Sequence, residues 1–366
     1  MRALHKGQRR LLLSVIYVAA TLQLVWCYLR IVHPYMNVKL YEAGTDRMPF
    51  QGRVMMMLPM RWADHSVVLH WLLSHSWRSV YWFPGPMTTQ AIVEAAIDVI
   101  SIAVAGWMTV KLYQASSRRR WFTPAIYPLF LAAFTATYVL HTVQNFRFFY
   151  DPPSLAFFAI AMYLIYTRRH WGWFAALFLV ATVNRETTLL LLPLYMIDRA
   201  CEDGRLVWRR LFAPRVLALV VPLALVWCAW TAGIHLHFAA NKSEFYPRFD
   251  WNLKSLAYPP AWPQMLSPCG FLLLYVVVRY RKISDARLRT WLWLLPIWLV
   301  FMFTYGILIE VRIWGELIPF VVCTASVILE EQLAARIGSE PVQVSISIAQ
   351  PSHEAVEAEQ DVAQAA

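Results

Sequence analysis

Four consecutive residues inside an apolar segment, Asn184-Arg185-Glu186-Thr187, carry the strongest chemical signal in the chain. The segment extends over residues 171–196, and a guanidinium and a carboxylate are costly to place in hydrocarbon. Residues of this kind usually face a bundle interior or a water-filled cavity. One interpretation is a salt bridge that only holds helices together. The other is that the pair lines a polar site at membrane depth.

Other charged residues occur in three turns that we expect to lie on the same side as this site. They are Glu42, Asp46 and Arg53 in the first turn, Arg147 and Asp151 in the second, and Glu310 and Arg312 in the last. If the turns share one side, their side chains form a mixed-sign cavity with Asn184, Arg185 and Glu186. The sequence therefore predicts a polar cavity beneath a broad outer loop.

Carboxylates and arginines in one cavity suit the transfer of a group from a lipid phosphate to a hydroxyl. A carboxylate can act as general base if it reaches the acceptor hydroxyl. Arginines bind phosphate through two parallel hydrogen bonds and stabilise charge on the leaving group. Asp46 is the best candidate for the base, because it lies in a loop beside Gly44 and Arg47. The alternative is an exposed loop acid that pairs with Arg47.

The composition identifies an integral membrane protein. Of the 366 residues, 59% are hydrophobic and 15% are charged, whereas soluble domains carry about 25% charged residues. The apolar residues form long runs, and the tryptophans and tyrosines suit a membrane interface. The net charge of +11 does not indicate a nucleic-acid partner, because the basic residues lie between the apolar runs. The expected partners are membrane lipids.

The predicted fold is all-α, a polytopic transmembrane helical bundle of about nine spans. Interfacial helices are expected at 54–60 and 67–82 in the first outer loop, and either could be a short extra span. The crossings are predicted at residues 11–31, 89–113, 124–143, 154–166, 216–234, 265–278, 290–309 and 313–328, together with a hairpin at 171–197.

The hairpin is predicted from charge. A straight crossing at 171–197 would place Arg199, Arg205, Arg209, Arg210 and Arg215 outside, whereas Lys and Arg of short loops prefer the cytoplasmic side. We therefore expect two half-length helices, broken near Asn184, that enter and return on one side. Broken helices are tolerated at membrane depth where they line a cavity.

With this hairpin, both termini are predicted to be cytoplasmic and most Lys and Arg lie in inner segments. Residues 1–333 form the predicted transmembrane domain, and residues 334–366 are a polar, mildly acidic segment expected to be a disordered cytoplasmic tail. The bacterial inner membrane is the expected location.

No motif identifies a cofactor or a metal site. The histidines at 65, 70 and 75 are five residues apart and fall on different helix faces, so no metal site is predicted. Phosphate-binding glycine loops, serine-nucleophile elbows and zinc motifs are not found. The cofactor requirement is therefore left unknown.

The pattern of the turns resembles bacterial multi-spanning proteins related to the GT-C glycosyltransferases. The resemblance covers residues 1 to about 333. It is carried by Tyr41-Glu42-Ala-Gly-Thr-Asp46-Arg47-Met-Pro49-Phe50-Gln-Gly-Arg53, Tyr150-Asp151-Pro-Pro-Ser154, Asn184-Arg185-Glu186-Thr187 before a leucine run, and Glu310-Val-Arg312 followed by Pro319.

This resemblance implies an inverting sugar transfer from a polyprenyl-phosphate donor to an acceptor on the non-cytoplasmic face. An acid of the first outer loop is the base in that family, which implies Asp46 or Glu42 here. Two other classes remain open. A transporter or flippase would also place charges and a broken helix at mid-membrane, and a non-catalytic membrane protein could keep a degenerate site.

Overall fold

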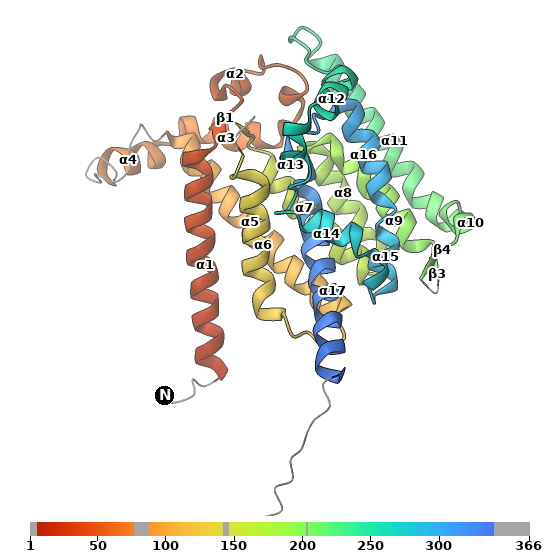
Figure 1. Cartoon of the computed structure of the whole chain (residues 1–366). Helices are drawn as coiled ribbons and strands as arrows, with labels where there is room; N and C mark the ends of the chain where they lie inside the picture. The colour runs from red at the N-terminus through yellow and green to blue at the C-terminus, as the bar shows by residue number, and fades with distance from the viewer. Residues whose placement is uncertain (1–5, 77–87, 142–145, 203, 340–366) are drawn as a thin grey trace, which may run out of the picture. The chain divides into compact units, whose positions relative to one another are not determined.

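The computed structural model describes residues 6–76, 88–141, 146–202 and 204–339 (Figure 1). Nearly all of the regular structure in these residues is helical, as the sequence predicts. The longer helices are α1 (Lys6–Ile31), α5 (Thr89–Ser116), α6 (Thr123–Tyr138), α7 (Asp151–Tyr166), α8 (Trp171–Asn184), α11 (Pro214–His237), α16 (Leu294–Tyr305) and α17 (Ile318–Ser339). Two-residue strands form two small pairs, β1 (His33–Pro34) with β2 (Phe146–Arg147), and β3 (Cys201–Glu202) with β4 (Arg205–Leu206).

Five helical stretches among the described residues are long and apolar enough to cross a membrane. They are Leu11–Ile31, Thr89–Ser116, Pro214–His237, Ala286–Tyr305 and Val311–Ile337. α7 and α8 are shorter apolar helices. The chain is thus a multi-pass membrane protein, and the predicted count of nine crossings stays a prediction.

The segment predicted as the first outer loop folds against one end of the bundle. It contains α2 (Val38–Ala43), two short 3-10 turns at Phe50–Gly52 and Val54–Met56, α3 (Met57–His65) and α4 (Val67–Ser76). Tyr41 is fully buried among methionines and the aromatic segment at 148–150. The predicted helices at 54–60 and 67–82 correspond to α3 and α4, although residues 77–82 lie outside the described residues. β1 and β2 pair in parallel and join this loop to the turn before α7.

α5, α6 and α7 form the centre of the core. α5 packs along α7, and Gly106 lets α6 approach α5 closely. A Cβ at Gly106 would lie 2.6 Å from a ring carbon of Tyr127, so a larger residue would push the helices apart. α6 begins at Thr123 with proline in its first turn and ends at Tyr138, several residues before the predicted limit at 143. Residues 142–145 lie outside the described part of the chain.

The predicted hairpin is present, and its helix breaks where the sequence becomes polar. α8 ends at Asn184, Arg185 is extended (φ −160°, ψ 145°), and a 3-10 turn, η3 (Glu186–Leu190), leads into α9 (Leu191–Arg199). The rings of Phe174 in α8 and Tyr195 in α9 stack at 5.0 Å, so the two arms lie side by side. Trp171 and Arg199, the outer limits of the arms, line one cavity. The segment therefore returns to the side from which it started.

The predicted single span at 265–278 is wrong in one respect, because its helix is interrupted. A short turn, α13 (Trp262–Met265), is separated from α14 (Leu272–Val278) by Cys269, Gly270 and Phe271, which all have positive φ. Three consecutive left-handed residues cannot continue a right-handed helix.

The elements between α9 and α17 are short apart from α11 and α16. They comprise α10 (Trp208–Leu211), α12 (Phe249–Leu256), η4 (Pro259–Ala261), η5 (Tyr280–Lys282), α15 (Ala286–Trp291) and η6 (Val311–Leu317). α15 and α16 replace the predicted span at 290–309 with a helix that is interrupted after Trp291.

The chain divides into two compact units, Met1–Glu331 and Gln332–Ala366. α17 continues to Ser339, so the first residues of the predicted tail are helical. Residues 340–366, which make up most of that tail, lie outside the described residues.

Candidate functional site

A buried cluster of charges joins the hairpin tip to α7 and η6. Nη1 of Arg185 lies 2.9 Å from Oδ1 of Asp151 and 3.0 Å from Oε1 of Glu316. Nη1 of Arg312 lies 3.4 Å from the other oxygen of Asp151, and its Nη2 lies 2.7 Å from Oε2 of Glu310. Arg185 is 5% exposed, and Asp151 and Glu316 are fully buried. Three segments far apart in sequence are thus held together by ion pairs.

Local sequence places each member of this cluster. Asp151 is the first residue of α7 and is followed by Pro152 and Pro153, whose missing N–H groups cost nothing in the first helical turn. The backbone of Arg185 is extended and does not continue α8, so its side chain is free to point away from the hairpin toward Asp151 and Glu316. Glu316 also accepts hydrogen bonds from Ser154 Oγ (2.8 Å) and Thr187 Oγ1 (2.7 Å).

Gly315 is required beside Glu316 because Tyr138 occupies the space of a side chain. A Cβ at this position would lie 1.9 Å from the hydroxyl oxygen of Tyr138. The absence of a side chain therefore lets η6 lie directly against α6. This close approach brings Glu316 within reach of the hairpin tip.

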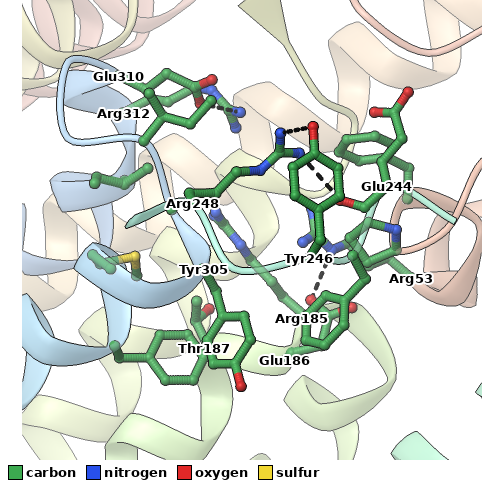
Figure 2. A pocket seen from close by; sticks show the side chains of 18 residues that line it. Arg53, Arg185, Glu186, Thr187, Glu244, Tyr246, Arg248, Tyr305, Glu310 and Arg312 are labelled. Carbon is green, nitrogen blue, oxygen red and sulfur yellow. Dashed lines mark hydrogen bonds and ion pairs between the residues drawn. The ribbon is translucent and has the colours of Figure 1, made fainter. Parts of the chain in front are cut away.

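A cavity of about 130 Å³ borders the cluster and shares Arg185, Glu310 and Arg312 with it (Figure 2). Its polar wall comes from the hairpin tip, the first outer loop, the segment before α12 and the turn before η6. Its apolar wall comes mainly from α16. The charged lining residues are Arg53, Arg185, Glu186, Glu244, Arg248, Glu310 and Arg312, and the apolar wall includes Phe301, Met302 and Tyr305.

Each lining carboxylate already has an arginine beside it. Oε2 of Glu186 lies 2.8 Å from Nε of Arg53. Glu310 pairs with Arg312, and Glu244 accepts from Nη1 of Arg47 at 2.7 Å. The Glu186 side chain is 23% exposed, more than those of Glu244 (18%) and Glu310 (13%). Among the described residues, Oε1 of Glu186 has no hydrogen-bond partner, so this oxygen is free to accept a proton.

Arg248 differs from the other lining arginines. It donates to the hydroxyl of Tyr246 and to the carbonyl oxygen of Glu244 (3.1 Å), and its guanidinium lies 3.8 Å from the Tyr246 ring centroid. Figure 2 shows it stretched across the cavity between Glu310 and Tyr246. Within the part of the chain that the structure describes, no carboxylate forms an ion pair with it. Its positive charge is therefore uncompensated by direct contact.

Aromatic faces support the other arginines. The guanidinium of Arg53 lies 4.2 Å from the Tyr150 ring centroid, and that of Arg312 lies 4.0 Å from the Phe148 ring centroid. Such contacts hold a guanidinium in place without neutralising it. The Tyr150 phenol has a raised pKa because it is buried, so it stays neutral beside these arginines.

Asp46 and Glu42, the two predicted catalytic acids, do not line this cavity. Asp46 is 2% exposed, and its Oδ1 accepts the backbone N–H of Arg47 at 2.8 Å. Its backbone carbonyl accepts from Asn241, which fixes the loop. Glu42 points to the start of α5, where it accepts from Gln90 Nε2 at 3.1 Å. Burial raises the pKa of its carboxyl.

The predicted binding residues divide into two groups. Arg53, Arg185, Glu186, Glu310 and Arg312 line the cavity, and Asp151 contacts two of them from below.

Arg147 and Asn184 lie outside the lining. Nε of Arg147 contacts Glu94 Oε1 at 2.9 Å, and its Nη1 donates to the carbonyl oxygens of Leu29 and Val32 at the end of α1. The amide of Asn184 donates to the carbonyl oxygen of Tyr150 at 3.1 Å. Both residues therefore position elements around the cavity.

Two lining residues, Glu244 and Arg248, were not predicted as site residues. They lie in the aromatic loop between α11 and α12, and their spacing of four residues is the signal that could have identified them. The loop is placed by contacts that a sequence does not reveal. Glu244 N donates to Met48 O at 2.8 Å, and Arg248 N donates to Thr304 O at 2.7 Å.

No metal centre is evident in this part of the molecule. Among the described residues, no group of three or more His, Cys, Asp and Glu side chains gathers in a way that would hold a metal ion.

Comparisons with known proteins give one distant similarity. No family model and no curated protein matches the chain. Among solved structures, the chain is similar to the crystal structure of ArnT from Cupriavidus metallidurans bound to undecaprenyl phosphate, with a TM-score of 0.48 and 15% identity. The match covers 89% of this chain and 63% of that one, so the chain spans less than two thirds of its length. At this identity and TM-score, the similarity assigns no activity to the chain.

Proposed function

We propose that the chain is a membrane glycosyltransferase that moves a sugar from a polyprenyl-phosphate donor to an acceptor hydroxyl. The observation that carries the proposal is the pairing, in one cavity, of an open carboxylate oxygen on Glu186 with the uncompensated guanidinium of Arg248. The apolar wall formed by α16 lies at the same cavity and suits the first part of a prenyl chain. ArnT, the similar solved structure, is bound to undecaprenyl phosphate.

In the proposed reaction, Glu186, Arg248 and Arg53 have separate roles. The acceptor oxygen attacks the anomeric carbon, its proton moves to Oε1 of Glu186, and the bond from that carbon to the phosphate oxygen breaks. Negative charge then builds on the departing polyprenyl phosphate, where Arg248 donates hydrogen bonds. Arg53 holds Glu186 in place through the other carboxylate oxygen.

We place the base at Glu186 rather than at Asp46 or Glu42. A general base must come within hydrogen-bond reach of the proton that it accepts. Glu186 lines the cavity, whereas the other two acids face the loop and α5. In this proposal Arg185, Glu310, Arg312 and Asp151 set the shape and charge of the cavity floor.

The orientation follows the distribution of basic residues. We propose that the cavity opens on the non-cytoplasmic face and that both termini are cytoplasmic, as expected for a bacterial inner-membrane protein. A cysteine at Arg118 should then react with an impermeant maleimide only after the membrane is opened. Labelling of intact cells at that position would reverse the assignment.

The test is turnover with defined donors. Purified full-length protein is incubated with a panel of polyprenyl-phosphate sugars and candidate acceptors, and donor consumption is measured. We expect one donor to be consumed and Glu186→Gln to lower the rate about 100-fold or more while donor still binds. Asp46→Asn is the matched control and should keep most activity. Full activity in Glu186→Gln would remove its role, and failure to bind any donor would overturn the proposed function.

A second candidate function is a non-catalytic protein that binds a lipid phosphate. It is favoured by one observation, that every lining carboxylate has an arginine beside it. A carboxylate stabilised in this way is a weaker base. Donor binding without consumption by any acceptor in the panel would favour this candidate.

A further inference from the structure

A second hollow lies at the other end of the hairpin, and its charge is not balanced. It has a volume of about 650 Å³ and is lined at its polar side by Arg169, Arg199 and Arg215, with His170 between them. No carboxylate lines it. Among the described residues, none of the three guanidiniums forms an ion pair with an acid. Three unpaired arginines around one space indicate a site for an anion.

The hollow is far from the polar cavity. Arg215 and Val216 begin α11, whereas Ile234, near its end, packs against Gly52 of the first outer loop. At a rise of 1.5 Å per residue, the 18 steps from Val216 to Ile234 span about 27 Å. This distance is close to the thickness of a bilayer core of about 30 Å. The two spaces therefore belong to opposite sides of the membrane.

The remaining walls are those of a membrane interface. Trp171 is 56% exposed, and Tyr195 lies beneath the guanidinium of Arg199 at 5.0 Å from the ring centroid. Tryptophan and tyrosine are typical of the headgroup level. Ala218 and Leu219 continue the wall along α11, the candidate span with the lowest buried share, 11%. A ligand here can extend from the arginines onto a surface that faces lipid chains.

We propose that this hollow binds one anionic glycerophospholipid, with its phosphate on Arg169, Arg199 and Arg215 and its acyl chains along α11. Nε of Arg199 supports this assignment, because it is a buried atom with no partner among the described residues. Asp198, the nearest acid in sequence, forms its ion pair with Arg287 and not with Arg199: it accepts two hydrogen bonds from Nη2 of Arg287 and one from the indole of Trp291. The lipid therefore supplies the negative charge that the protein does not.

The bound lipid also ties together the base of the hairpin. Arg169 precedes α8, Arg199 ends α9 and Arg215 lies in the first turn of α11, so a phosphate held by the three arginines would link these three elements. The tip of the same hairpin carries Arg185 and Glu186. Anionic lipid in one leaflet thus stabilises the element that forms the polar cavity in the other.

The first experiment measures lipid retention. Delipidated full-length protein is titrated with phosphatidylglycerol or phosphatidylcholine and examined by native mass spectrometry. The test variant is Arg169→Gln/Arg199→Gln/Arg215→Gln. The matched control is Arg118→Gln/Arg119→Gln/Arg120→Gln, which removes the same charge from exposed residues of another turn. We expect the test variant to bind phosphatidylglycerol on the order of tenfold or more weakly, and the control to bind like the natural chain. Equal retention by test variant and natural chain would overturn the proposal.

The second experiment uses the natural chain, so it does not depend on folding of a variant. A photoreactive phosphatidylglycerol is crosslinked in vesicles, and the labelled peptides are identified. Labelling of residues 169–171, 195–199 or 215–219 supports the site, and labelling that avoids all three segments overturns it. Inorganic phosphate is the competitor that separates a lipid headgroup from a free anion. Loss of crosslinking at millimolar inorganic phosphate would show that the site takes the free ion, against the proposal.

Discussion

The arginines at the two ends of the hairpin differ in how their charge is compensated. At the tip, Arg185 is buried and contacts both Asp151 and Glu316. At the base, Arg199 lies over the ring of Tyr195, forms no ion pair with an acid among the described residues, and lines a hollow with two further arginines. The difference shows that this chain compensates charge internally where the protein encloses the side chain. At the base, where no described acid forms an ion pair with Arg199, our proposal assigns the compensating charge to a bound lipid.

The largest expected effect comes from removing the buried guanidinium. Arg185→Met leaves Asp151 and Glu316 without their shared partner, and breaking a buried pair costs about 3–5 kcal/mol. We expect a clear fall in the unfolding midpoint in detergent. Arg199→Met is the control at the opposite end, and in lipid-free detergent it should change the midpoint little. Equal effects would show that the two arginines are not compensated differently.

The next largest effect is a loss of stability when the close packing beside the hairpin tip is disturbed. Gly315→Ala places a methyl group on the Tyr138 hydroxyl, and overpacking of this kind costs about 1–3 kcal/mol. The change should lower the unfolding midpoint and reduce donor consumption, because Glu316 shifts with the backbone. Adding Tyr138→Leu should recover part of the loss, which a double-mutant cycle would measure. Strict additivity of the two changes would contradict the proposed clash.

A smaller effect is expected on donor binding when Arg248 is changed. The charge of this arginine has no ion-pair partner among the described residues, although it lines the cavity at the hairpin tip. Arg248→Lys keeps the charge and loses the planar fork, so donor binding should weaken by about tenfold. The unfolding midpoint should stay unchanged, since no ion pair is lost. Titration of donor followed by tryptophan fluorescence measures the first quantity. Unchanged affinity would remove Arg248 from the donor site.

The smallest effect concerns Glu42, whose pKa is raised by burial. An acid with a raised pKa in the folded state binds its proton more tightly when folded, so stability increases as pH falls through that pKa. Glu42→Gln removes the charged form and should slightly raise the unfolding midpoint at pH 7, with the difference fading at pH 4. Donor consumption should be retained. Loss of turnover in this variant would instead support the base that the family resemblance implies.

The sequence predicted the helical membrane fold and the broken hairpin. Both predictions rest on local features of the chain, namely long apolar runs and the preference of arginines in short loops for the cytoplasmic side. The sequence also predicted that Asp46, Asp151, Arg185 and Arg312 meet, and the structure brings together the last three. It did not predict the position of Asp46, which depends on a hydrogen bond between its backbone and Asn241. It also missed Arg248, whose loop is held by Asn252 on the carbonyl oxygens of Phe303 and Gly306.

These last contacts join segments about fifty residues apart or more. Local pattern carries no information about them, because loops lack the periodicity that reveals which face is buried. The predicted span at 265–278 failed for a related reason. Its apolar composition favoured one helix, whereas the positive φ values at Cys269 and Phe271 require tertiary support that composition does not reveal.

The extended backbone of Arg185 has a consequence for how the protein is made. Because the chain turns back there, the stretch from Arg199 to Arg215, with its five arginines, stays in the compartment where α8 began. The polar residues that must enter the lipid with the two apolar arms are then those of the short tip. A straight helix would have placed all five cations on the opposite side of the membrane.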